Sequence, residues 1–234
     1  MRRITYKKAA AVAMAAALSA ALLVGCGSTA ASTDSVAAST VADESTAEDA
    51  EKTADEGDAD EVAAKNCADL IDAIYMQERS ADTDAQCEAA KAAWDALTDT
   101  QKELVEGENA DPDYFGRDTG DAGKDDPRNA DDIGENELLV VSFGTSFNGS
   151  RAADIKGIED ALQAAYPDWS VRRAFTAQII INHVQARDGE KIDNMDQALE
   201  RAVANGVKNL VVQPTHLMHG AEYDEMCEAV EQYR

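Results

Sequence analysis

Two histidines and a glutamate lie close together in the sequence at a place where they could do chemistry. His216 and His219 follow a short apolar segment, residues 210–213, and Glu222 comes directly after them. Imidazole and carboxylate groups suit a divalent metal such as cobalt, nickel, zinc or iron, and they can also remove a proton near neutral pH. Alternatively, these side chains cap the next helix and bond backbone groups. The residue types alone leave both interpretations open.

A second polar loop follows an earlier apolar run, LLVVSF at residues 138–143. An unbroken run of β-forming residues predicts a strand buried on both faces, as in parallel sheets. Gly144, Thr145 and Ser146 then precede an amphipathic helix. Ligands of open α/β sheets bind where strands end and helices begin, so the two loops are candidate walls of one site. The sequence contains no P-loop and no GxGxxG, which argues against nucleotide binding. It also contains no GxSxG motif of serine hydrolases and no paired-cysteine spacing for zinc.

The elements that must position these loops alternate between strand and helix through residues 137–234. Strands are predicted at 138–143, 170–175 and 210–213. Helices are predicted around Ile155, Ile158 and Leu162, at 178–186, around Met195, Leu199 and Val203, and from 222 onward. This order predicts an α/β fold with a parallel sheet, flanking helices and right-handed crossovers.

Residues 1–26 form a targeting segment and lie outside the fold. Basic residues precede an alanine-rich apolar stretch that is too short for a convincing membrane span. The stretch ends at LVGC, residues 23–26, which resembles a bacterial lipobox. We therefore expect an exported protein whose Cys26 carries lipid and anchors it to the outer face of the cell membrane. An ordinary signal peptide with an incidental cysteine is the alternative.

Three further segments separate Cys26 from the α/β part. Residues 27–66 contain Ala, Ser, Thr, Asp and Glu with few large apolar residues, which predicts a disordered acidic tether. Residues 67–107 carry apolar residues at helical spacing and predict a small all-α module, in which Cys67 and Cys87 are the natural disulfide pair. Residues 108–136 are rich in Gly, Asp, Asn and Pro and predict a linker. The formal net charge of −25 argues against nucleic acid as a partner.

Four motifs in the α/β part resemble one known family. They are LLVVSFGTS (138–146), RAFT (173–176), RDG (187–189) and VQPTHLMHGAEY (212–223). Together they are similar to the anaerobic cobalt chelatases, which insert a metal ion into sirohydrochlorin for cobalamin synthesis. The resemblance implies one half of a two-domain, ferrochelatase-like fold, with the tetrapyrrole in the cleft between halves. The helical segment resembles a small repeat of bacterial surface proteins, which implies a spacer.

The resemblance assigns roles to the two loops. It implies that Glu222 and His216 are the catalytic cleft residues and that His216 contacts the metal. His219 is a weaker metal candidate that rests on its residue type and position, because the resemblance does not assign it. Gly144, Thr145 and Ser146 would contact a macrocycle carboxylate. The family's principal metal-coordinating histidines lie in a second half, which does not follow here. We expect either a fragment or a half-domain that pairs with a second copy; the position of Arg234 within a helix favours the fragment.

The leading hypothesis is thus a membrane-anchored chelatase that takes a divalent metal, Co²⁺ first, and a tetrapyrrole as substrates and needs no organic cofactor. The main alternative is a surface lipoprotein that captures a tetrapyrrole or metal for uptake without catalysis. A surface spacer that has lost its activity is a third interpretation.

The lipobox-like segment makes a direct prediction about the mature protein. If signal peptidase cleaves before Cys26, mass spectrometry of the membrane fraction should find a lipid-modified Cys26 as the N-terminus. An intact leader, or cleavage at another residue, contradicts the lipoprotein interpretation.

Overall fold

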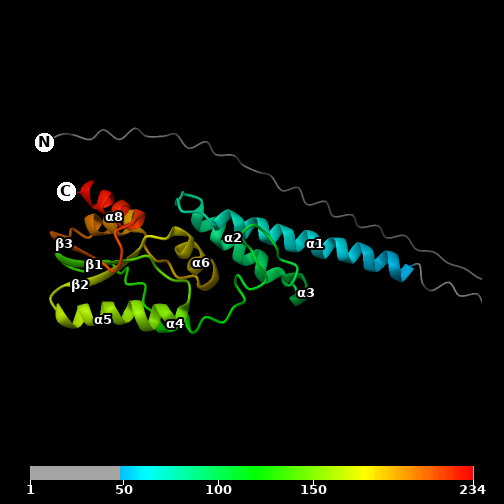
Figure 1. Cartoon of the computed structure of the whole chain (residues 1–234), viewed down its shortest axis with the longest axis horizontal. Helices are drawn as coiled ribbons and strands as arrows, with labels where there is room; N and C mark the ends of the chain where they lie inside the picture. The colour runs from blue at the N-terminus through cyan, green and yellow to red at the C-terminus, as the bar shows by residue number, and fades with distance from the viewer. Residues whose placement is uncertain (1–47, 234) are drawn as a thin grey trace, which may run out of the picture. The chain divides into compact units, whose positions relative to one another are not determined.

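The computed structural model describes residues 48–233 and places a parallel sheet at the centre of the α/β part (Figure 1). The strands are β1 (Asn136–Ser142), β2 (Ser170–Phe175) and β3 (Asn209–Pro214), in the order β2-β1-β3. β1 pairs in parallel with both neighbours, from Glu137↔Ser170 to Ser142↔Phe175 on one side. This confirms the predicted α/β class. The signal segment, Cys26 and residues 27–47 lie outside the described residues.

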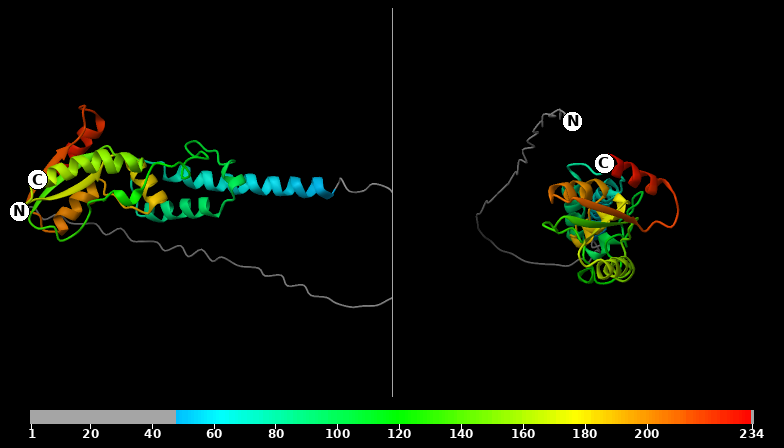
Figure 2. Two further views of the ribbon diagram at one scale, coloured as in Figure 1. Left: turned by 90° about the horizontal axis from the view of Figure 1, so that it is seen from below. Right: turned by 90° about the vertical axis from the view of Figure 1, so that its left-hand side faces the viewer.

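Helices cover both faces of the sheet (Figure 2). After β1, the short α4 (Asn148–Ser150) and the π-helix η2 (Arg151–Ile155) lead into α5 (Lys156–Ala165), whose Leu162 packs with Leu138 and Val171. On the other face, α7 (Met195–Ala204) and α8 (Ala221–Glu231) pack on Leu139 and Val141. β3 lies at the edge of the sheet, and every second side chain along it is exposed.

Two details of the predicted helix faces are wrong. Ile158 of α5 and Val203 of α7 were expected to face the core, but they are 46% and 65% exposed. The half-buried Ile155 and Leu162 on the α5 side and the buried Leu199 and Ala202 of α7 pack against the core instead. Gly206, two residues beyond α7, has a left-handed φ of 70°, which is typical of the glycine that ends a helix.

The N-terminal helices form what we call the helical module, residues 48–105. It comprises α1 (Glu48–Ile74), α2 (Thr83–Ala96) and α3 (Asp99–Lys102), the last with a capping box from Thr98 to Gln101. The prediction of disorder up to residue 66 is wrong in its second half, since α1 begins at Glu48. The few large apolar residues in this segment suggested disorder, but small side chains form part of the core here. Ala64 and Ala68 of α1 are both buried in it.

The segment predicted as a linker, residues 108–136, is also packed in part. Tyr114 and Phe115 are buried, and the Phe115 ring meets Trp94 of α2 edge-on with 5.7 Å between centroids. A short 3₁₀ turn, η1 (Ala122–Lys124), follows, and then Asp125 is fully buried against Arg173 of β2. The glycines and prolines set the turns of this segment, but its aromatic rings bury enough surface to hold it in place.

The expected disulfide between Cys67 and Cys87 is absent from the described structure. Both cysteines are free and fully buried, and burial raises the pKa of the Cys87 thiol to about 11. The Cys87 thiol lies 3.6 Å from the carbonyl oxygen of Asn182, so it faces α6 and not Cys67. Cys227 is a free thiol on α8, as expected for the unpaired cysteine.

The helical module docks on α6 (Gln178–Asp188), the helix that follows β2. The buried Asn182 side chain donates to the Ile74 carbonyl oxygen at 2.8 Å, and Gln185 donates to Asp84 at the same distance. Ala186 belongs to the module's apolar core. Module and α/β part therefore share one buried interface. Within residues 48–233, no helix has the length and apolar character needed to cross a membrane.

One buried carboxyl makes the stability of this fold depend on pH. Glu137 of β1 is 1% exposed, and burial raises its pKa to about 7 from 4.5. The folded state therefore holds this proton more tightly than the unfolded chain. Protonation of Glu137 contributes fully to folding stability below about pH 4.5, and this contribution is lost as the pH rises through 7. Glu137→Gln should raise the free energy of unfolding by about 2–3 kcal/mol at pH 8 and by much less at pH 5.

Denaturant unfolding of both proteins at the two pH values checks this expectation. Comparing wild type with Glu137→Gln at each pH cancels the other titrating groups. An equal difference at pH 5 and pH 8 contradicts the assignment.

Candidate functional site

Hydroxyl and imidazole groups connect the three strands where they end. The Thr215 hydroxyl, just after β3, donates to the Ser142 hydroxyl of β1 at 3.0 Å. The neighbouring His216 places Nε2 3.3 Å from the Thr176 hydroxyl oxygen, just after β2. We call Ser142, Thr176, Thr215 and His216 the polar floor. It spans the boundary of the sheet formed by the carboxyl ends of the three strands, where ligands of parallel α/β folds bind. We call this boundary the carboxyl edge.

His216 is the residue of this floor with unused bonding capacity. Its side chain is half-buried, its Nε2 meets Thr176, and its Nδ1 is buried with no hydrogen-bond partner. Buried polar atoms without a partner are uncommon, because each costs about 1–3 kcal/mol. His216 is therefore held in place by Thr176, and the missing partner of its Nδ1 is a feature that the rest of the floor does not explain.

The loop of Gly144, Thr145 and Ser146 lies on the β1 side of the same edge. Gly144 has a φ of +102°, and a Cβ there would lie 2.5 Å from Cδ2 of Phe175. The Thr145 hydroxyl oxygen accepts from the Phe147 N–H at 3.2 Å, which closes a tight turn. Only glycine fits at position 144, because the backbone of the loop passes close to the ring of Phe175 on β2.

Two arginines hold the end of this loop. The Ser146 carbonyl oxygen accepts from Arg187 at 2.7 Å and from Arg151 at 3.4 Å. Arg187 also bonds the Asn148 side chain, which begins α4. The RDG segment thus positions the site loop from α6, which the sequence alone did not reveal.

His219 and Glu222 lie at the start of α8. His219 is exposed, lies 2.5 Å from Asp224 and meets the Tyr223 ring at 5.0 Å between centroids. Glu222 is half-buried in the first turn of α8, with one carboxylate oxygen folded back toward Gly220. Among residues 48–233, no three His, Cys, Asp or Glu side chains converge as a metal site. The metal roles of His216 and His219 and the catalytic role of Glu222 stay predictions.

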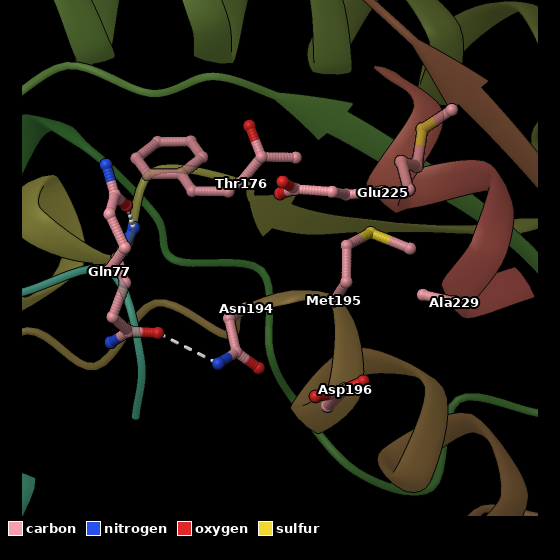
Figure 3. A pocket seen from close by; sticks show the side chains of 10 residues that line it. Gln77, Thr176, Asn194, Met195, Asp196, Glu225 and Ala229 are labelled. Carbon is pink, nitrogen blue, oxygen red and sulfur yellow. Dashed lines mark hydrogen bonds between the residues drawn. The ribbon is translucent and has the colours of Figure 1, made fainter. Parts of the chain in front are cut away.

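A cavity of about 170 Å³ opens beside Thr176 (Figure 3). Asn194 donates to the Gln178 side chain at 2.8 Å on one wall, and the Glu225 carboxylate points from α8 toward Thr176 on another. Gln77 of the helical module lines the same cavity. Thr176, Glu225 and Gln77 come from three separate segments, and sequence reasoning assigned no role to any of them.

The fold and this edge define a class: a parallel α/β domain with a histidine-bearing polar floor at its carboxyl edge. A family model described as cobalt chelatase (CbiK) matches residues 136–234, so this part of the chain is similar to the cobalt chelatases. It is similar to the sirohydrochlorin cobaltochelatase of Salmonella typhimurium (strain LT2), with 39% identity over 97 residues. That match covers 42% of this chain and 37% of the relative.

Gly144→Ala should damage the site loop. The new Cβ would need Phe175 to move and would force a side chain into a left-handed conformation, which together should cost about 1–3 kcal/mol of unfolding free energy. Gly157→Ala is the control, because this α5 glycine has nothing within 4 Å of its Cβ position and alanine should stabilise the helix slightly. Equal melting temperatures for Gly144→Ala and wild type would contradict this account of the loop.

Proposed function

We propose that residues 136–234 are the substrate-binding half of a chelatase that inserts a divalent metal, Co²⁺ first, into a sirohydrochlorin-like tetrapyrrole. The observation that carries the proposal is the polar floor, where His216 is fixed by Thr176 and keeps a buried Nδ1 without a partner. The 39% identity to a sirohydrochlorin cobaltochelatase covers this same edge and supports the substrate class. A role in anaerobic cobalamin synthesis belongs to the proposal and rests on the resemblance of the four sequence motifs to the anaerobic cobalt chelatases.

The reaction exchanges pyrrole N–H protons for the metal ion, so the site must hold the macrocycle, admit a cation and accept protons. His216 lies on the floor, and its imidazole can meet the metal or a macrocycle arm through a ring nitrogen. The backbone N–H groups of Gly144, Thr145 and Ser146, with the hydroxyls of Thr145 and Ser146, suit a carboxylate arm. Glu222, half-buried at the start of α8, can guide the cation or take a proton.

A second candidate is a lipid-anchored binding protein that captures the tetrapyrrole or metal without inserting it. The lipobox-like segment at residues 23–26 favours it, since an exported protein meets substrates outside the cytoplasm. The two candidates differ in one measurable event, the formation of a metallated tetrapyrrole.

Glu222→Gln separates catalysis from binding. Glutamine keeps the size and hydrogen bonding of Glu222 but removes its charge and basicity. In the protein extended through the family's second half, the rate of cobalt insertion into sirohydrochlorin, followed by absorbance, should fall by about 10²–10⁴-fold if Glu222 is the base. Tetrapyrrole affinity should change far less, because a half-exposed hydrogen bond contributes little.

Glu228→Gln is the matched control, because Glu228 is an exposed glutamate on the same helix. It should insert cobalt at the wild-type rate. If Glu222→Gln does so too, Glu222 is not the base and acts at the helix N-terminus. If wild type binds the tetrapyrrole but forms no metallated product, the binding-protein candidate holds. If wild type does not bind it, the proposed function is wrong.

A further inference from the structure

Large apolar side chains are exposed around the polar floor. They lie in pairs on three loops: the α1–α2 loop, the loop after β1 and the loop after β3. The exposed fractions are Tyr75 43%, Met76 38%, Phe143 46%, Phe147 47%, Leu217 101% and Met218 82%. The first pair belongs to the helical module, outside the residues that match the chelatase family.

The α1–α2 loop reaches the site on the side of β2. The Gln77 side-chain oxygen accepts from the Gln178 N–H at 3.2 Å, at the first residue of α6 (Figure 3). Gln77 also lines the cavity that contains Thr176, the partner of His216. The module thus caps the helix that follows β2 and borders the polar floor there.

The same loop borders the site on the side of β1. Tyr75 lines a second cavity, of about 220 Å³, together with Ser146 and Phe147 of the site loop. Its far wall is Tyr114 stacked on His183, with 4.2 Å between ring centroids. The Tyr114 hydroxyl is buried without a hydrogen-bond partner among the described residues.

We propose that the helical module forms one wall of the tetrapyrrole site, with Tyr75 and Met76 in contact with the macrocycle. This rests on the proposed function. A macrocycle has broad apolar faces, and an aromatic ring packed on such a face gains about 0.5–1.5 kcal/mol beyond the area that it buries. The exposed pairs lie on loops next to the hydroxyls and imidazole of the floor, and apolar surface beside a few polar groups is the pattern of a binding site for a flat, amphipathic ligand. The module is then part of the site and not a spacer.

The test compares two exposed tyrosines in the purified full chain, with sirohydrochlorin alone as the probe. Tyr75→Ala should weaken binding by about 5–20-fold in an absorbance titration, and Tyr75→Phe should bind like wild type because the ring remains. Tyr166→Ala is the matched control. Tyr166 is 52% exposed, but it precedes β2 and so lies at the opposite edge of the sheet. It should leave the affinity unchanged.

Hydrogen exchange gives a second readout that needs no substitution. Bound sirohydrochlorin should slow amide exchange in residues 75–80 of wild type. Wild-type affinity for Tyr75→Ala, together with unchanged exchange in this loop, overturns the proposed wall while leaving the proposed function intact. No binding by wild type overturns both.

Discussion

A buried pair of arginines holds together the parts of the chain that build the site. Arg173 of β2 donates to Asp125 at 2.7 Å and to Glu159 of α5 at 2.8 Å, and all three side chains are fully buried. Burial alone would lower the pKa of Arg173, but its bonds to Asp125 and Glu159 raise it well above the usual value. Arg151 shares Asp125 and reaches the Ser146 carbonyl oxygen. Breaking such a network costs about 3–5 kcal/mol, because one charge would stay buried alone.

This constraint connects the packed segment before β1 to the site loop. Asp125 is the only carboxylate among the described residues that pairs with both buried arginines, so residues 117–135 are fixed across β2 and η2. The π-helix at η2 starts with Arg151, and π-helical turns commonly occur at functional sites. The helical module also helps to position the loop of residues 144–146. It packs against α6, and Arg187 of α6 donates to the Ser146 carbonyl oxygen. The loop is thus positioned by contacts that are distant in sequence.

Much of the α/β part could be predicted because its signals are local. Apolar runs give the strands, and the loops at their ends lie at one edge in every parallel sheet. His216 could be placed on that edge, but its contact with Thr176 could not, since the pairing depends on strand order. The network of Arg173 with Asp125 was invisible for a different reason: charged residues in a Gly- and Asp-rich segment indicate a solvated linker unless their distant partners are known.

The acidity of the chain bears on how two very different substrates would reach this edge. A formal net charge of −25 attracts divalent cations and repels a macrocycle that carries carboxylates. Such repulsion is screened beyond about 8–10 Å at physiological salt, so it acts on the approach more than on the bound state. Tetrapyrrole affinity must then come from short-range contacts, which the exposed apolar pairs and the uncharged hydroxyls of the floor supply. Long-range electrostatic attraction would bring the metal ion to the site, and local packing contacts would bind the macrocycle.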